Sequence, residues 1–383
     1  MKPTVLLVAD RYYPQVDGVL LFMEQFLKQA QDQFTLKLLV PKISTKKRFL
    51  DVETTFLELS KKLKLSGYPG IKILSLKNNR LIKKAVKAAD VLFVQELGPT
   101  GVKAVHYAHK FKIPSVMYIH NTHWDFFAEY FSFLPKIINK LVKRFFVHYF
   151  NRNSALLVPY RNLENELKKA GVKAPIEVAR LGVDIHRFSP VKDKTAIRKK
   201  LGLPLDKKII GYVGRISREK NVQILIEAFK KLQTEEDVYL LLVGDGPQDQ
   251  VQLGKKTKKC KMTGFVNNVE EYLQAMDIFV MPSLTETTSL ATLEAMATGL
   301  PVVVTKVGFM QYYITKNYNG LFFPRNSATM LAIKIEKLLR DQELRGQLGE
   351  QARKTVAYSF SWDRSINKMK RLLKKYIHYN QNI

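Results

Sequence analysis

Short apolar runs alternate with amphipathic helical stretches along the whole chain. The run at residues 4–9 is followed by a glycine-containing loop and by a segment with helical periodicity at 19–30. The same order returns at residues 207–232. Further apolar runs stand at residues 89–95, 114–120, 154–160, 238–246, 276–283 and 300–305. Buried strands that alternate with helices are typical of parallel sheets covered on both faces, so the pattern predicts an α/β protein with two doubly wound, Rossmann-like domains.

An irregular segment at residues 179–190 divides the two halves. It contains Gly182 and Pro190 and precedes a helical stretch. We expect an N-terminal domain over residues 1–182 and a C-terminal domain over 183–360. The last stretch, about 361–383, has the pattern of a basic amphipathic helix with no strand after it, so we expect it to pack back on the N-terminal domain.

Composition narrows the class of protein. A chain of 383 residues with 46% hydrophobic content can bury a sizeable core. One cysteine, Cys260, excludes an internal disulfide framework and a cysteine-based metal cluster, and the histidines lack ligand spacing, so no metal or cofactor is expected. Asp10 and Arg11 interrupt the first apolar run before a signal peptide forms, and no stretch approaches the roughly 20 apolar residues of a membrane span. A cytoplasmic protein is expected.

The charge balance indicates polyanionic partners. Lys and Arg number 63 against 34 Asp and Glu, a formal net charge of +29. Nucleic acid, an anionic membrane surface and phosphorylated substrates all fit such a charge. A lysine-rich surface of the thermophilic kind is the plainer interpretation, but such surfaces usually balance Lys with Glu.

Two cations mark a candidate phosphate site. Arg215 follows an apolar run directly, and Lys220 lies five residues on, at the start of a helix. Such a pair beside unpaired helix amides suits a diphosphate. An ordinary solvated loop explains these two residues equally well. A complete dinucleotide fingerprint, a Walker motif and a nucleophile elbow are absent from the sequence, which disfavours dehydrogenases, P-loop ATPases and serine hydrolases.

Two glutamates flank a predicted helix start. A helix at residues 290–298 should be capped by Thr288 or Ser289 and end at Gly299. Glu286 then lies in the loop before this helix and Glu294 lies within it. Eight helical residues span about 12 Å, the reach of a nucleotide-sugar, so one carboxylate could hold a hexose and the other a ribose. Taken alone, ordinary helix decoration is the simpler explanation.

These residues stand within a larger resemblance. The chain resembles glycosyltransferase family 4, retaining enzymes with two Rossmann-like domains facing across a cleft (the GT-B fold), and within it the glycolipid-synthesising members such as diacylglycerol glucosyltransferases. Its carriers, in family order, are "YYPQVDGV" at 12–19, "YIHNTHWD" at 118–125, "RLGVDIHRFSP" at 180–190, "GRISREKN" at 214–221, "LVGDGP" at 242–247, "MTGFV" at 262–266, and the pair of glutamates at 286 and 294 followed by "AMATGLPVV".

The resemblance implies roles for individual residues. Glu286 would contact hydroxyls of the donor sugar, Glu294 would hold the nucleotide ribose, and Arg215 with Lys220 would bind the diphosphate. Gly18 matches a loop glycine that lets the N-terminal domain approach the phosphates, and His120 a histidine beside the donor sugar. The segment around Val266 resembles one that touches the base through backbone atoms.

One departure affects the donor. The family often has E-G-F-G-L after the first glutamate, whereas this chain has "ETTSL". Backbone amides at Thr288, Ser289 and Leu290 can still donate, but a narrower sugar pocket is expected. The donor, a UDP-hexose or GDP-mannose, stays open.

The resemblance also implies a mechanism. A hexose would move from a nucleoside diphosphate to a hydroxyl with retention, the cations and helix dipoles stabilising the leaving diphosphate without a metal. The departing phosphate would help to deprotonate the acceptor on the same face of the sugar, with His120 and Glu286 as catalytic residues. A covalent carboxylate intermediate is not required.

Basic segments in the N-terminal half bear on the acceptor. Lys136, Lys140, Lys143 and Arg144 share one arc of a predicted helix, and an apolar set with Leu134, Ile138, Leu141, Phe145 and Tyr149 shares the opposite arc. This pattern fits a helix lying on an anionic bilayer, although a domain helix with a solvated basic side explains one helix better. Residues 42–87 are basic as well, and "SGYPGIKILSL" at 66–76 resembles a loop before the membrane-binding helix of glycolipid synthases.

Three functions are compatible with the sequence. The first is a glycosyltransferase, peripheral on the inner face of the cell membrane, whose partners are a nucleotide-sugar and a lipid of the diacylglycerol type. The second is a glycosyltransferase with a soluble sugar or polysaccharide acceptor. The third is a basic nucleic-acid-binding protein on a Rossmann scaffold, which lacks a recognisable reading motif. The oligomeric state is not indicated.

Overall fold

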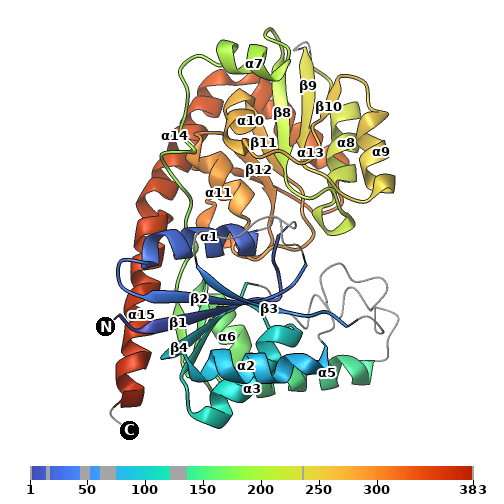
Figure 1. The fold of residues 1–383 in the computed structure, drawn as a ribbon. Helices are drawn as coiled ribbons and strands as arrows, with labels where there is room; N and C mark the ends of the chain where they lie inside the picture. Colours follow the sequence, from blue (N-terminus) through green and yellow to red (C-terminus); the bar gives the residue numbers. More distant parts are fainter. Residues whose placement is uncertain are drawn as a thin grey trace. The chain divides into compact units, whose positions relative to one another are not determined.

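The chain forms two compact units, each built on a parallel sheet. The computed structural model describes residues 2–13, 18–43, 52–60, 75–120, 136–234 and 237–381. The first unit comprises residues 1–180 and 363–383, and the second comprises residues 181–362 (Figure 1). The predicted α/β fold with two doubly wound, Rossmann-like domains is confirmed.

The first unit contains a seven-stranded sheet in the order β3-β2-β1-β4-β5-β6-β7. All of its pairings are parallel. The strands are β1 (Thr4–Val8), β2 (Thr35–Pro41), β3 (Glu53–Leu57), β4 (Val91–Val94), β5 (Ser115–Tyr118), β6 (Ala155–Val158) and β7 (Ile176–Val178). Its central strands are short and wholly buried, as expected of a sheet covered on both faces.

Helices cover both faces of this sheet. They are α1 (Gly18–Ala30), α2 (Asn79–Lys87), α3 (Pro99–Phe111), α5 (Lys136–Phe150), α6 (Arg161–Lys169) and α15 (Trp362–Gln381), with a 3₁₀ turn at Leu76–Asn78. Figure 1 shows α1 on one face and α2, α3 and α5 on the other. On α15, Lys370 pairs with Asp32 at 2.9 Å and Lys375 with Glu177 at 3.0 Å, which attaches the last helix to this unit.

The second unit repeats the plan with six parallel strands in the order β10-β9-β8-β11-β12-β13. The strands are β8 (Lys208–Val213), β9 (Val238–Val243), β10 (Cys260–Met262), β11 (Ile278–Met281), β12 (Val302–Thr305) and β13 (Leu321–Phe323). The helices are α7 (Thr195–Leu201), α8 (Val222–Lys230), α9 (Gln248–Lys255), α10 (Val269–Ala275), α11 (Leu290–Ala297), α12 (Met310–Tyr313), α13 (Ala328–Arg340) and α14 (Gln342–Ser359), with a 3₁₀ turn at Arg218–Lys220.

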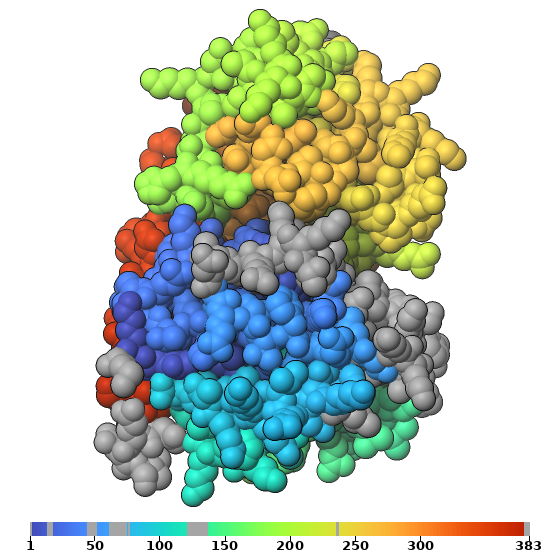
Figure 2. Space-filling view, viewed as in Figure 1, coloured from blue at the N-terminus to red at the C-terminus, as the bar shows by residue number. Residues whose placement is uncertain are grey.

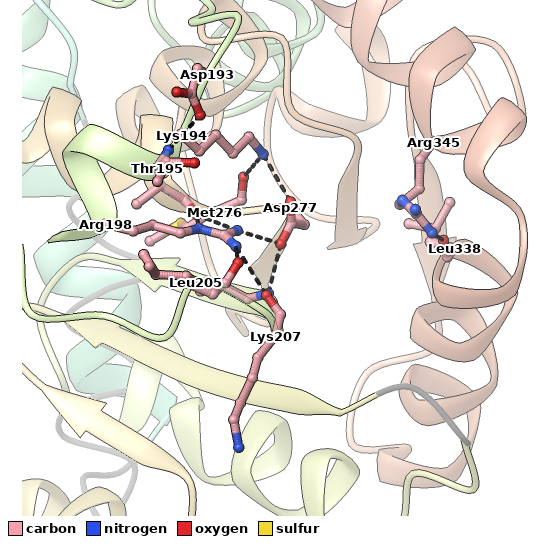
Figure 3. Close-up of polar contacts among 12 residues, drawn as sticks. Asp193, Lys194, Thr195, Arg198, Leu205, Lys207, Met276, Asp277, Leu338 and Arg345 are labelled. Atoms are coloured by element: carbon pink, nitrogen blue, oxygen red, sulfur yellow. Dashed lines mark hydrogen bonds and ion pairs between the residues drawn. The ribbon is translucent and has the colours of Figure 1, made fainter.

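A polar cluster lies at the amino ends of β8 and β11 in the second sheet. Arg198 is buried and donates to Asp277 Oδ2 at 2.7 Å, and Lys194 Nζ donates to Asp277 Oδ1 at 2.9 Å (Figure 3). Asp277 Oδ2 also accepts the Ile209 N–H at 2.8 Å. Because every member is hydrogen-bonded, this cluster locks α7 against the starts of β8 and β11 and is structural.

Membrane-spanning segments were sought among the helices. Within the described ranges, no helix is long and apolar enough to cross a bilayer.

Candidate active site

In the second unit, the predicted site residues gather where the strand order reverses. β8 and β11 are neighbours, and the sheet extends from β8 through β9 in one direction and from β11 through β12 in the other. Ligands of doubly wound sheets bind beyond the carboxyl ends of strands at this point. Arg215 and Lys220 follow β8, and Glu286 follows β11.

Lys220 and Glu286 are in direct contact. Lys220 Nζ lies 2.6 Å from Glu286 Oε1, and the Glu286 side chain is only 9% exposed. Ser283 Oγ donates to the same oxygen at 2.9 Å, so Oε2 carries neither bond. The Leu284 N–H donates to Glu219 O at 2.8 Å, which ties the two loops together. The sequence placed both residues at the donor but did not predict that they pair.

Arg215 lies in the same loop after β8 as Lys220, with its side chain exposed. Its carbonyl accepts a hydrogen bond from the buried Tyr212 hydroxyl at 2.7 Å, which fixes the backbone at this position. In the described parts of the chain, no acidic side chain pairs with its guanidinium. The guanidinium is therefore available for an anionic ligand.

The start of α11 offers unpaired donors to the same region. Ser289 is the N-cap residue, as predicted, but its side chain makes no capping bond; its hydroxyl lies 2.8 Å from the Thr292 hydroxyl instead. The backbone N–H groups of Thr288, Ser289 and Leu290 donate to no acceptor within the described residues. The Thr288 Oγ1 atom is buried and has no partner there. Orphan donors of this kind suit an anionic ligand.

The end of α11 follows the prediction closely. Thr298 is the C-cap residue, and Gly299 adopts φ +79° at the C′ position. The Leu300 N–H donates to Ala295 O at 3.1 Å, which satisfies a carbonyl of the last turn.

Glu294 lies inside α11, as predicted, in a half-buried position. Burial raises its pKa to about 7, Arg187 opposes this increase, and Glu270 adds to it. Arg187 Nη2 donates to Glu270 Oε2 at 2.7 Å and to Asn267 O at 2.9 Å. Arg187 therefore holds the loop that contains the half-buried Val266. This role of Arg187 was not predicted from the sequence, although the residue belongs to the motif at 180–190.

The first unit carries the remaining two predicted site residues. Gly18 is the first residue of α1, and His120 follows β5 in a buried position. The His120 ring packs on Tyr118 with centroids 4.5 Å apart and on Phe22 at 5.5 Å. Parts of the two motifs around Gly18 and His120, residues 14–17 and 121–125, lie outside the described residues.

Gln95 orients the His120 imidazole. His120 Nε2 lies 2.9 Å from Gln95 Oε1, and Gln95 Nε2 donates to Phe93 O at 3.4 Å. Because the amide nitrogen faces Phe93, the amide oxygen faces His120, and the imidazole must donate its Nε2–H. Gln95 was not predicted from the sequence, because its only signal there is its position at the end of a strand.

The basic helix α5 exposes part of its predicted apolar arc. Leu141 and Phe145 are 58% and 45% exposed, and Ile137 is 68% exposed. The plainer interpretation, a domain helix that buries this arc, does not hold for Leu141 and Phe145, because Phe146, Val147 and Tyr149 pack on the core instead. Lys140, Lys143 and Arg144 are exposed; Lys136 begins the helix, and Leu134 and residues 66–74 lie outside the described residues.

No metal site stands out. In the parts of the chain that the structure describes, no group of three or more His, Cys, Asp and Glu side chains could hold a metal ion. The expectation that no metal is required stays a prediction.

Two family models match the chain. The model of Glycosyl transferases group 1 matches residues 193–355, and the model of Glycosyltransferase Family 4 matches residues 36–187. The first match contains the Lys220–Glu286 pair and α11, and the second contains Gln95 and His120.

Curated relatives carry different acceptors in their names. The chain is 31% identical to TuaC of Bacillus subtilis, a glycosyltransferase named for teichuronic acid biosynthesis, over 278 residues that cover 71% of this chain and 67% of TuaC. It is 27% identical to the alpha-monoglucosyldiacylglycerol synthase of Acholeplasma laidlawii over 291 residues, 71% of this chain and 72% of that synthase.

A solved structure shares the fold of both units. HepE from Anabaena, crystallised with UDP and glucose, aligns with a TM-score of 0.77 at 20% identity, covering 97% of this chain and all of HepE.

Proposed function

The chain belongs to glycosyltransferase family 4 and has the GT-B fold, and we propose that it transfers a hexose from a nucleoside diphosphate sugar to a hydroxyl of a membrane lipid. Family membership sets aside the nucleic-acid-binding alternative. The observation that carries the donor half of this proposal is the Lys220–Glu286 pair at the strand-order reversal.

The donor lies across the carboxyl ends of β8 and β11. The diphosphate sits against Arg215, Lys220 and the free amides at the start of α11, with the hexose toward Glu286 and the ribose toward Glu294. Fixed charges and amides around the diphosphate stabilise the negative charge that develops as it leaves, so they favour the transition state over the bound donor. The UDP bound to HepE supports a nucleotide donor. UDP-hexose and GDP-mannose both fit this arrangement.

We assign the transfer to a retaining, same-face mechanism. Glu286 Oε1 is engaged by Lys220 and Ser283, which favours Glu286 as a hydroxyl acceptor over Glu286 as a nucleophile. The departing phosphate takes the proton of the acceptor hydroxyl. His120, oriented by Gln95, supports the sugar.

The proposal of a lipid acceptor is based on a layer of three helices that contain no acidic residues. α2 contacts α3, and α3 contacts α5. α2 carries four Lys or Arg, α3 two and α5 four, and none of the three helices contains Asp or Glu. In Figure 2 the side chains of this layer, light blue to green, form the surface at the bottom of the view.

Apolar side chains accompany this charge. Ile137, Leu141 and Phe145 recur every four residues along α5 and are exposed beside Lys140 and Arg144. Exposed apolar side chains within a basic surface are typical of a helix that lies in the interface of an anionic bilayer. A lipid acceptor, as in the name of the A. laidlawii synthase, fits such a surface, and the enzyme would act as a peripheral protein on the inner face of the cell membrane.

A vesicle flotation assay tests the proposed binding to an anionic membrane. Vesicles with 30% phosphatidylglycerol are expected to carry the protein upward, and neutral vesicles are not. The variant Leu141→Ser/Phe145→Ser should lose binding at physiological salt. Ile333→Ser, which removes an exposed apolar side chain from α13 in the second unit, should keep it. Equal flotation of wild type and the double variant would overturn the role of α5.

A soluble acceptor is the second candidate. The name of TuaC, which refers to teichuronic acid biosynthesis, supports a product other than a diacylglycerol glycolipid. Turnover with soluble sugars in the absence of any lipid would establish it in place of the lipid acceptor.

A further inference from the structure

The loop between Glu286 and α11 is held from one side by the segment that precedes and includes α12. The Phe309 N–H donates to Thr287 O at 2.7 Å, and the Tyr313 hydroxyl donates to Thr288 O at 2.9 Å. In a trans peptide the N–H points opposite to the C=O. The N–H groups of Thr288 and Ser289 therefore point away from Phe309 and Tyr313.

This arrangement requires an unfavourable backbone at Ser289. The residue has φ +59° and ψ +75°, in the left-handed region. A residue with a β-carbon adopts this region at a cost in free energy, whereas glycine adopts it freely. The surrounding contacts must offset that cost.

Close packing around the loop between Glu286 and α11 restricts its backbone conformation. Gly308 has φ +52°, and a β-carbon there would lie 1.8 Å from Glu286 O. The segment that starts at Gly308 therefore runs directly beneath the loop. Its last residue, Tyr313, reaches the peptide that precedes Ser289.

Tyr313 itself is rigidly placed. It is 6% exposed and makes edge contacts with Phe309 and Phe360, each with ring centroids 5.4 Å apart. Burial, with Glu286 adding to the effect, raises the pKa of its phenol well above the ordinary value, so the hydroxyl stays protonated. A fixed, protonated phenol is a permanent donor to Thr288 O.

We propose that Tyr313 is a positioning residue for the donor diphosphate, holding the Thr288 carbonyl so that Ser289 keeps its left-handed conformation and the Thr288 and Ser289 amides face the phosphates. The proposal rests on the proposed function. In this chain the hydrogen bond from the Tyr313 phenol stabilises the left-handed conformation at residue 289, which a glycine there would adopt without such support.

The test compares Tyr313→Phe with the double variant Tyr313→Phe/Ser289→Gly. The single variant removes one oxygen atom and keeps the ring packing. One neutral hydrogen bond is worth about 1 kcal/mol, so we expect the Kd for UDP or GDP, whichever the wild type binds, to rise about fivefold in isothermal titration calorimetry. Ser289→Gly should restore the affinity, because glycine holds the turn without the bond. Tyr312→Phe, at an exposed neighbouring tyrosine, is the matched control and should bind as wild type does.

Each outcome is decisive. Unchanged affinity in Tyr313→Phe, or failure of Ser289→Gly to restore it in a variant with wild-type melting temperature, overturns the positioning role. Should Tyr313→Phe unfold, Ser289→Gly alone serves: affinity at least equal to wild type supports the proposal, and a fall overturns it. Diphosphate binding without transfer to any acceptor defeats the proposed function alone, and a wild-type chain that binds neither UDP nor GDP defeats both.

Discussion

Lys220 Nζ and Glu286 Oε1 lie 2.6 Å apart, joining the loop after β8 to the loop after β11. The pair is partly shielded, with 24% of the Lys220 side chain and 9% of the Glu286 side chain exposed. In the proposed function, Lys220 would bind the leaving diphosphate and Glu286 the sugar hydroxyls, so each of the two residues would hold the other in place for the reaction.

Removal of the lysine charge should disable transfer. Lys220→Met is expected to lower kcat/KM about 10²–10³-fold, because the leaving group loses a fixed charge and Glu286 loses its partner. Steady-state kinetics with the active donor measure the effect. Lys230→Met, at an exposed lysine on α8, is the control. A Lys220→Met enzyme within threefold of wild type would exclude the lysine from the site.

Donor binding should depend on pH through Glu294. Burial raises the pKa of Glu294 to about 7, so the free protein carries a neutral carboxyl below that pH. The ionised carboxylate accepts ribose hydroxyl bonds better than the neutral acid does. The donor KM is therefore expected to rise as pH falls from 8 to 6, and Glu294→Gln should flatten this profile. A wild-type profile without that rise would contradict the ribose contact.

The raised pKa of Glu294 should also make the stability of the fold depend on pH. Between the ordinary pKa of 4.5 and about 7, the native state keeps a proton on Glu294 that the unfolded chain has released, so ionisation of Glu294 destabilises the fold as pH rises. In thermal melts, Glu294→Gln should gain more melting temperature over wild type at pH 8 than at pH 5. An equal gain at both would argue against the shifted pKa.

Gln95 should control the chemistry of His120. Gln95→Leu removes the acceptor for His120 Nε2–H and is expected to lower kcat about tenfold, with the donor KM little changed. Nitrogen-15 NMR of the imidazole provides a second readout, because the neutral ring in wild type should carry its proton on Nε2. A ring protonated on Nδ1 in wild type would show that Gln95 does not set the tautomer.

The Asp277 cluster should affect stability and leave turnover per folded molecule unchanged. Burial alone would raise the pKa of Asp277, but Lys194, the Ile209 N–H and Arg198 outweigh it and lower the pKa. The cluster therefore stabilises the fold at neutral pH and weakens as pH falls through the lowered pKa. Arg198→Met should cost about 3 kcal/mol in urea unfolding at pH 7. A cost below 0.5 kcal/mol, roughly the scale of a surface pair, would show that the cluster contributes little.

The sequence predicted the architecture because its central strands are short, continuous apolar runs. Five strands were not singled out: β2, β3, β7, β10 and β13. The strands β7, β10 and β13 have only three residues each, and β2, β3 and β10 contain polar residues that interrupt a continuous apolar run. The sequence also left open which side of α5 is buried. Helical periodicity defines an arc, but which part of an arc is buried depends on neighbours such as α3, which the sequence does not position.

Some residues of the candidate site could be predicted from the sequence and others could not. Glu286, Glu294, Arg215 and Lys220 could be named from spacing and resemblance because they stand in motifs. Arg187, Gln95 and Tyr313 could not, because each acts through a hydrogen bond to a residue more than 20 positions away in the chain. Such contacts arise only when the strands come together.

The proposed reaction is the retaining transfer of a hexose to a lipid hydroxyl. The most direct test incubates the protein with UDP-glucose, UDP-galactose or GDP-mannose and phosphatidylglycerol vesicles containing diacylglycerol, and then determines the product by mass spectrometry and proton NMR. A glycolipid whose new linkage keeps the α configuration of the donor is the predicted result. A β-linked glycolipid, or transfer to soluble sugars alone, would contradict it.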